Sequence, residues 1–254
     1  PLLKRKAFIW WNFPVSDYVR DRLLLGAVYG NGTDIDDDIS AFISNPMEHA
    51  EASKIALFSI ADYAWNMDAY KSDASWRRAV RYLMPGHAAA LQVFASHNSD
   101  LGGNEHDFRR EESEQIRPAL ERLLDAYCRE GKREVAAASA VTEECERMIA
   151  SADLLLASDE NPALIKEITP WLMQFKLLGE YGREVLCMLA AQCDGKKTEL
   201  EKAASHAKAL QVLMKKIDAT YNQNGFQPGV KTGSCHLKPA FDRLYQEVVQ
   251  RTGK

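Results

Sequence analysis

The sequence predicts an α/β unit followed by an all-α unit, and three observations support this fold class. Two short apolar runs, residues 7–11 and 39–44, are each followed by a polar turn and a helical pattern. Long segments with apolar residues three and four positions apart fill the second half of the chain. A stretch rich in Gly and Asn, residues 96–107, predicts the boundary, so that residues 1–107 form the first domain and residues 108–254 the second.

The first apolar run, Ala7–Trp11, is predicted to be a buried parallel strand. A continuous apolar run that ends at a Pro turn and precedes a helical pattern is typical of a strand covered on both faces. Ligands of parallel sheets bind at the carboxyl ends of the strands, where this chain places Trp10, Asn12 and Asp17. An indole face suits the C–H side of a sugar ring, and amide and carboxylate groups suit its hydroxyls. The local chemistry therefore suits a carbohydrate.

The alternation of side chains along a strand assigns the two tryptophans to different environments. Trp10 and Trp11 are predicted to point to opposite faces, one toward the barrel interior and the other toward the helix layer. Asn12 lies two positions after Trp10 and points the same way. Both tryptophans in a core would be the simpler alternative.

The segment Val15–Leu25 is predicted to be a helix, because Val19, Leu23 and Leu24 share one side and Gly26 follows. Asp17 would lie in the first turn of this helix. An acidic residue there can simply complement the helix dipole, which is the alternative to a role in binding.

A second strand and helix repeat the same arrangement. Ile39–Ser44 is predicted to be the strand, and Asn45, Pro46 and Glu48 then match a helix start with Asn45 as the N-cap. The helix continues to about Asn66. A cap at the carboxyl ends of the strands can also contact a ligand, so both roles of Asn45 stay open. Two such units look like part of a (β/α) barrel, although two units cannot close one.

The acidic run Asp36, Asp37 and Asp38 is the clearest alternative for a catalytic group, since close carboxylates can share a proton. However, it precedes the second strand and would lie at the end of the barrel opposite to the ligand. We therefore expect a solvated acidic turn.

Composition excludes several other functions. The chain has 254 residues and a net charge of −4, which gives no basic surface for nucleic acid or anionic membrane. Its five cysteines lack a C-x-x-C pair and its six histidines lack ligand spacing, so no metal and no cofactor are expected. Residues 225–232 miss the spacing of a phosphate loop. The chain starts at Pro1 with no signal peptide or membrane-spanning run, and we expect a fragment or excised domain.

Helical patterns account for most of the remaining sequence. Residues 70–94 contain two pieces that are interrupted at Pro85 and Gly86. Four or five longer helices are predicted after the boundary, joined by short breaks that suit antiparallel neighbours in a bundle. They span roughly Arg110–Arg129, Arg133–Ala157, Asn161–Cys193, Lys197–Asn222 and Lys238–Arg251.

Several blocks resemble a known enzyme family. WWNFPVSDY (residues 10–18), LLLGAVYGN (23–31) and NPMEHAEASKIALFSIADYAWN (45–66) resemble the last part of the catalytic barrel of family 84 glycoside hydrolases, the O-GlcNAcases and bacterial hyaluronidase-like β-N-acetylglucosaminidases. HNSDLG (97–102), RREES (109–113), EITPWLMQFKLLGEYGREVL (167–186) and QPGVKTG (227–233) resemble the helical domain that follows the barrel in bacterial members. The resemblance implies the last strand-helix units of a (β/α)8 TIM barrel followed by an α-helical bundle.

The resemblance also implies a mechanism and a set of binding residues. Family members are retaining hydrolases that use the substrate's 2-acetamido group as nucleophile, an exception to the rule of two enzyme carboxylates. Their adjacent Asp pair lies on an earlier barrel strand, so no catalytic residue is expected in this chain, which alone should be inactive. Trp10 would line the acetamide pocket, Asp17 would bind hydroxyls on the far side of the sugar, and Asn12 and Asn45 would complete the substrate-binding set.

The implied partners are N-acetylglucosamine-containing glycans or O-GlcNAc proteins, together with the upstream part of the barrel. Neither nucleic acid nor a membrane span is expected. The resemblance implies a bacterial protein of the periplasm or the exterior, with a cytoplasmic location left open. The alternative function is a non-catalytic helical interaction module that retains a piece of barrel sequence.

Overall fold

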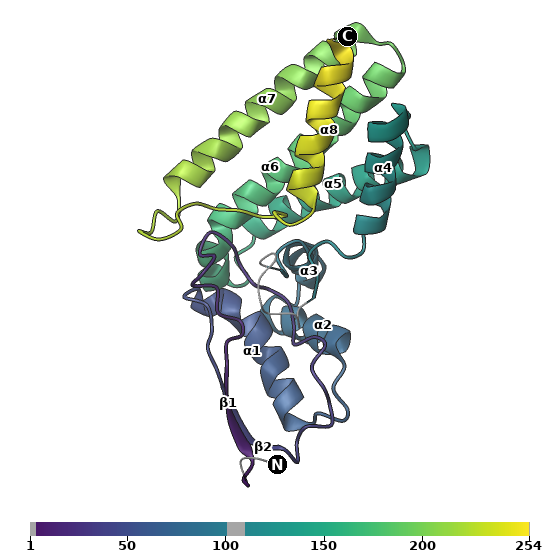
Figure 1. The fold of residues 1–254 in the computed structure, drawn as a ribbon. Coiled ribbons are helices and arrows are strands. Elements are labelled where there is room, and N and C mark those ends of the chain that lie inside the picture. The colour runs from purple at the N-terminus through teal and green to yellow at the C-terminus, as the bar shows by residue number, and fades with distance from the viewer. Residues whose placement is uncertain (1–3, 101–109, 254) are drawn as a thin grey trace.

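The computed structural model describes residues 4–100 and 110–253 and contains two strands and eight helices in these ranges. The predicted boundary at residue 107 lies outside the described residues. In Figure 1 the strand pair and α7 lie at opposite ends of the molecule. The elements are β1 (Ala7–Trp11), β2 (Ile39–Ser44), α1 (Ala50–Trp65), α2 (Ser72–Leu83), α3 (Ala88–Ser96), α4 (Arg117–Glu130), α5 (Val135–Leu156), α6 (Pro162–Cys193), α7 (Lys197–Thr220) and α8 (Leu237–Thr252).

The two strands have the bounds that the sequence predicts, and they pair in parallel. Their register joins Ala7 to Ile39 and Trp11 to Ser44, with an irregularity after Ala7. On one face Trp11 packs against Tyr63 of α1, with ring centroids 6.0 Å apart. This face corresponds to the predicted helix layer.

The prediction that both faces of the strand are covered is wrong for the described residues. Phe8 is 66% exposed and Trp10 is 67% exposed on β1, and Ile43 is 47% exposed on β2. The reason is that α1 covers one face of the pair, and no described element covers the other. The apolar run therefore marks a strand correctly but overstates its burial.

The predicted helix at Val15–Leu25 is absent, and the chain forms turns there instead. The amide of Val19 donates to the carbonyl of Ser16 at 2.9 Å, and the amide of Arg22 donates to the carbonyl of Val19 at 3.0 Å. These bonds span three residues, so they close single turns and do not propagate a helix. Asp17 consequently lies in a turn and not in the first turn of a helix.

Residues 23–28 run as a buried segment outside any helix or sheet ladder. Leu23, Leu25 and Val28 are each 1% exposed. Buried backbone groups must find hydrogen-bond partners, and here they find side chains and loop backbone from elements that follow much later in the chain. The bonds are Leu25 N to Asn98 O (2.8 Å), Trp76 Nε1 to Leu25 O (2.8 Å), Val28 N to Ser59 Oγ (2.9 Å) and Tyr70 OH to Val28 O (2.8 Å).

Gly26 explains why this segment can lie so close to the loop after α3. A Cβ atom at this position would lie 3.1 Å from the carbonyl oxygen of Ser99 and 3.5 Å from its Cβ. The missing side chain therefore permits a close approach of two backbones, and Gly26 does not terminate a helix.

The bundle is built around α6, which packs against α5, α7 and α8. Its start follows the local rules, because Asn161 Oδ1 accepts the amide of Leu164 at 3.2 Å and Pro162 occupies the first turn. Gly182 lets α8 approach closely, since a Cβ there would lie 2.5 Å from the ring of Phe241. The predicted helices of the second half are confirmed, with small shifts at their ends.

The start of α4 differs more from the prediction, because this helix begins at Arg117 and not at Arg110. Pro118 lies in its first turn, where the missing amide hydrogen costs nothing, whereas an earlier start would place this proline inside the helix. Ser113, with a φ of 60°, also interrupts a helical path.

Other features of the described residues concern cysteines and membranes. All five cysteines are free, and Cys187 and Cys193 are exposed. None of the helices in the described ranges combines the length and the apolar character needed to span a bilayer.

The buried segment generates a stability prediction. Ser59→Ala removes the oxygen that accepts the amide of Val28 and leaves that amide buried without its partner. We expect the free energy of unfolding to fall by about 1–3 kcal/mol. Chemical denaturation measures this, with Ser139→Ala on the exposed side of α5 as the control. Equal stability of the two variants would show that the Ser59 bond contributes nothing.

Candidate substrate-binding site

The carboxyl ends of β1 and β2 are tied together by hydrogen bonds. The amide of Asn45 donates to the carbonyl of Trp11 at 2.9 Å, and the hydroxyl of Ser44 donates to the carbonyl of Phe13 at 2.7 Å. These bonds continue the parallel pairing beyond the last residues of the strands. They hold the two polar turns side by side, as expected for neighbouring strand ends.

Three of the four predicted binding residues are joined by direct hydrogen bonds. Nε1 of Trp10 donates to Oδ1 of Asn12 at 2.9 Å, and Nδ2 of Asn45 donates to the same oxygen at 3.2 Å. We call Trp10, Asn12 and Asn45 the strand-end cluster. The predicted shared orientation of Trp10 and Asn12 is confirmed by this bond.

The strand-end cluster leaves its outward polar groups available. The amide nitrogen of Asn12 and the amide oxygen of Asn45 have no hydrogen-bond partner among the described residues. Trp10 presents an indole that is 67% exposed. One donor, one acceptor and one aromatic face thus lie together, a combination that suits a hydroxylated ring.

Asp17 lies in the turn that follows, outside this hydrogen-bonded group. Its carbonyl accepts the Nε of Arg20 at 3.2 Å, and its exposed carboxylate makes no hydrogen bond to a described residue. Because the predicted helix is absent, the alternative explanation of Asp17 as a partner of a helix dipole does not apply. The carboxylate is left free for an external partner.

The turn that carries Asp17 is held by the loop between α7 and α8. Nδ2 of Asn222 donates to the carbonyl of Arg20 at 2.8 Å, and the amide of Arg20 donates to Oε1 of Gln227 at 3.1 Å. The amide of Lys231 donates to the carbonyl of Asp21 at 2.8 Å. The helical bundle therefore fixes the backbone next to Asp17, over more than 200 residues of sequence.

Helix α6 also holds this turn in place. Nε1 of Trp171 donates to the carbonyl of Asp21 at 3.0 Å, and both groups are buried. In Figure 1 the chain after β1 runs from the strand pair up to the bundle, which agrees with these contacts. No pattern in the sequence indicates these supporting residues, because each acts through one long-range backbone contact.

Asn45 is not the N-cap of α1, which corrects the sequence prediction. The helix begins at Ala50 with His49 as the N-cap. The carboxylate of Glu167 on α6 accepts the amides of Ala52 at 2.7 Å and Glu51 at 3.3 Å. A carboxylate at this end also complements the helix dipole. Since a distant residue caps the helix, the side chain of Asn45 is not needed for that purpose.

His49 is half-buried beside this cap. Its ring meets Trp171 edge to face, with centroids 4.9 Å apart, and its Nε2 has no hydrogen-bond partner in the described part of the chain. Burial lowers the pKa of His49, although the carboxylates of Glu167 and Glu48 act in the opposite direction. The folded protein therefore favours the neutral imidazole.

The acidic run Asp36, Asp37 and Asp38 lies where the sequence predicts. All three residues are exposed, and the amide of Ala7 donates to the carbonyl of Asp38 at 3.0 Å, at the amino end of β1. Lys6 pairs with Asp37 at 3.6 Å. The run is a solvated turn at the end of the strands opposite to the strand-end cluster.

A buried Ser-His-Glu arrangement is the other grouping that resembles catalytic machinery. His97 lies 2.8 Å from the hydroxyl of Ser113 through Nδ1 and 2.7 Å from Glu144 through Nε2. His97 and Ser113 are at most 2% exposed, and the adjoining cavity measures about 10 Å³. Such a space holds about one water and no substrate. The arrangement joins the end of α3 to α5 and leaves no room for a substrate beside it. No grouping of three or more His, Cys, Asp or Glu that could hold a metal ion occurs within residues 4–100 and 110–253.

Comparison with protein families finds two matches that together span most of the chain. Residues 112–245 match the family described as the post-catalytic domain of bacterial GH84. Residues 1–96 match the family described as beta-N-acetylglucosaminidase. The strand-end cluster lies within the second match.

Solved structures with the same fold agree with the family matches. CpGH84B is 25% identical with a TM-score of 0.83, and this chain covers 40% of that chain with 95% of its own residues. CpGH84D is 28% identical with a TM-score of 0.83, over 97% of this chain and 41% of that one. A mutant of the O-GlcNAc hydrolase of Thermobaculum terrenum is 20% identical, with a TM-score of 0.72, over 98% of this chain and 50% of that one. The chain thus spans half or less of the length of these proteins.

The half-buried imidazole of His49 generates a pH prediction. In the unfolded chain His49 takes up a proton near pH 6.5, whereas in the folded chain its lowered pKa delays this to a lower pH. The unfolded state therefore binds more protons in this window, and stability falls as the pH drops through about 6.5.

The measurement compares unfolding of the parent protein and His49→Gln between pH 8 and pH 5. The stability of the parent should fall relative to the variant as the pH decreases, and the difference should level off below the folded pKa. If stability depended on pH in the same way in the parent and in the variant, His49 would have the same pKa in the folded and the unfolded chain.

Proposed function

Since the chain belongs to the bacterial glycoside hydrolases of family 84, we propose that it supplies the sugar-binding side of a β-N-acetylglucosaminidase site. The observation that carries this proposal is the strand-end cluster. Trp10, Asn12 and Asn45 are hydrogen-bonded to one another at the carboxyl ends of two parallel strands, the edge where α/β barrels build their active sites.

Each predicted residue has a separate task in this proposal. Trp10 forms a wall of the pocket that holds the acetamido group, against which its exposed indole packs. Asn12 and Asn45 offer their remaining amide groups to the sugar. Asp17 accepts hydrogen bonds from hydroxyls on the far side of the ring, a task for which its free carboxylate is suited.

The catalytic carboxylates are proposed to lie outside this chain. Family 84 resemblance implies an adjacent Asp pair on an earlier barrel strand, which polarises the acetamido group and serves as acid and base. The exposed apolar side chains of β1 and β2, among them Phe8 and Ile43, would then pack against the other strands and interior of the barrel. This arrangement makes residues 1–107 the carboxyl-terminal portion of the barrel and residues 108–254 its supporting helical domain.

The proposed substrates carry a terminal β-linked N-acetylglucosamine on a glycan or a protein. One structural relative is named an O-GlcNAc hydrolase. Because it is only 20% identical to this chain, its structural similarity supports the fold alone. The 2-acetamido group is the feature that the mechanism requires, because it acts as the nucleophile. The group beyond the glycosidic bond is therefore less constrained by these residues.

A kinetic experiment tests the assignment of Asp17 in the longer protein that includes the proposed upstream strands. Asp17→Ala removes one charged hydrogen-bond acceptor for a sugar hydroxyl, worth roughly 1.5–3 kcal/mol. We expect kcat/KM for an aryl β-N-acetylglucosaminide to fall about tenfold to more than a hundredfold. The matched control is Asp36→Ala, which removes an equally exposed carboxylate at the opposite end of the strands. An equal effect of both substitutions would remove Asp17 from the site.

A binding experiment separates this function from that of a non-catalytic helical module. Titration of the 254-residue chain with N-acetylglucosamine should give saturable NMR shifts at the indole N–H of Trp10, and Asp17→Ala should weaken the binding. Galactose, which lacks the acetamido group, serves as the comparison sugar. If neither sugar perturbs the Trp10 signal, the helical-module function is favoured.

A further inference from the structure

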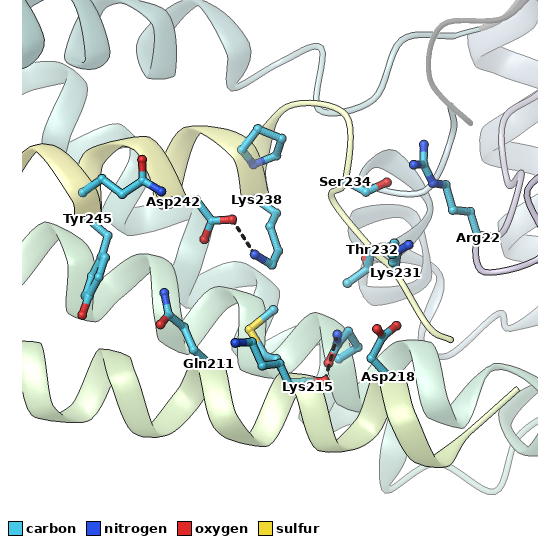
Figure 2. A pocket seen from close by; sticks show the side chains of 14 residues that line it. Arg22, Gln211, Lys215, Asp218, Lys231, Thr232, Ser234, Lys238, Asp242 and Tyr245 are labelled. Atoms are coloured by element: carbon cyan, nitrogen blue, oxygen red, sulfur yellow. Dashed lines mark hydrogen bonds and ion pairs between the residues drawn. The ribbon is translucent and has the colours of Figure 1, made fainter. Parts of the chain in front are cut away.

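A groove of about 700 Å³ is lined mainly by side chains of α7, α8 and the loop before α8, with Arg22 at its edge (Figure 2). Its volume falls in the range of small-molecule binding sites. Figure 2 shows side chains of α7 facing side chains of α8, with the loop before α8 across one end. None of the four residues that we assign to the sugar-binding side lines this groove.

Two buried oxygens in the lining lack hydrogen bonds. Gln174 is 5% exposed and Thr232 is 3% exposed. Oε1 of Gln174 and Oγ1 of Thr232 have no partner among the described residues. Nε2 of Gln174 donates to the carbonyl of Met214 at 3.4 Å, so the amide oxygen is the polar atom of this side chain that lacks a hydrogen bond. Native proteins seldom leave buried oxygens unpaired, and both could be satisfied by a ligand with O–H groups.

The charges of the lining leave a positive excess. Four cationic and two anionic side chains line the groove, namely Arg22, Lys215, Lys231, Lys238, Asp218 and Asp242. Lys238 pairs with Asp242 at 2.6 Å, and Arg22 and Lys231 both pair with Asp21, which does not line the groove. Lys215 makes no ion pair or hydrogen bond with a described residue. One ligand anion next to Lys215 would match this excess.

Asp218, one turn further along α7 than Lys215, provides an acceptor that requires donors from the ligand. One oxygen of Asp218 accepts the amide of Val230 at 2.9 Å, and its second oxygen has no partner in the described ranges. This oxygen of Asp218 and Oε1 of Gln174 are both acceptors, so hydroxyl groups of a ligand could donate to them. The side chains of Met214, Pro239 and Tyr245 add apolar surface for a ring.

From this combination we propose that the groove binds an acidic sugar, a hydroxylated ring that carries one carboxylate. A neutral sugar would satisfy Gln174 and Asp218 but leave Lys215 without a partner. Inorganic phosphate would pair with Lys215, but it bears close to two charges at neutral pH and has few donors for the buried oxygens. A carboxylated sugar supplies both the anion and the donors.

The test measures binding of glucuronate, glucose and inorganic phosphate to the 254-residue chain by calorimetry or NMR. Glucuronate should bind best, with glucose and phosphate at least about tenfold weaker, because each lacks one of the two interactions. Lys215→Gln should weaken glucuronate binding roughly tenfold or more. Thr232→Val, which keeps the shape but removes the hydroxyl, should weaken it as well.

Lys216→Gln is the matched control, because Lys216 is the next residue of α7, is exposed and lies outside the lining. Glucuronate should bind this variant as it binds the parent. Equal affinities for glucuronate and glucose, or for glucuronate and phosphate, would overturn the proposed ligand class. Equal losses in Lys215→Gln and Lys216→Gln would overturn the location. Absence of binding by all three compounds would mean that water satisfies the buried oxygens, and would overturn the site.

Discussion

The buried backbone of residues 23–28 is the constraint on which the arrangement of α1, α2 and α3 depends. This segment follows β1 and the Asp17 turn, and it is buried without a strand or helix of its own. Its amides and carbonyls therefore need partners from other elements. Ser59 on α1, Tyr70 just before α2, Trp76 on α2 and Asn98 after α3 provide them. Once these bonds form, the three helices are fixed around the segment.

Residues just before this segment connect the candidate site to the helical bundle. Just before it, the carbonyl of Asp21 accepts from Trp171 on α6 and from the amide of Lys231 in the loop before α8. The Asp17 turn is thus held between the strand ends and the bundle. On the other side of the site, Glu167 caps α1 and spares Asn45 that task. The helical bundle consequently supports the Asp17 turn and the start of α1, although it contributes no residue to the strand-end cluster.

The sequence predicted the features that depend on local rules. Both strands and the shared orientation of Trp10 and Asn12 follow from short-range patterns and were confirmed. The helix at Val15–Leu25 was wrong, because apolar spacing alone cannot distinguish a helix from a buried irregular segment whose partners lie far away. The start of α1 was wrong for a similar reason, since its cap comes from Glu167, more than 100 residues later. No local pattern reveals such a contact.

The central claim is that these residues form one side of a glycosidase site whose acid and base lie on preceding barrel strands. The most direct measurement is hydrolysis of an aryl β-N-acetylglucosaminide by the 254-residue chain and by a longer protein that includes those strands. We expect the longer protein to hydrolyse the substrate and the 254-residue chain to be inactive. Hydrolysis by the 254-residue chain would contradict the claim, because it would place the acid and base among the residues described above.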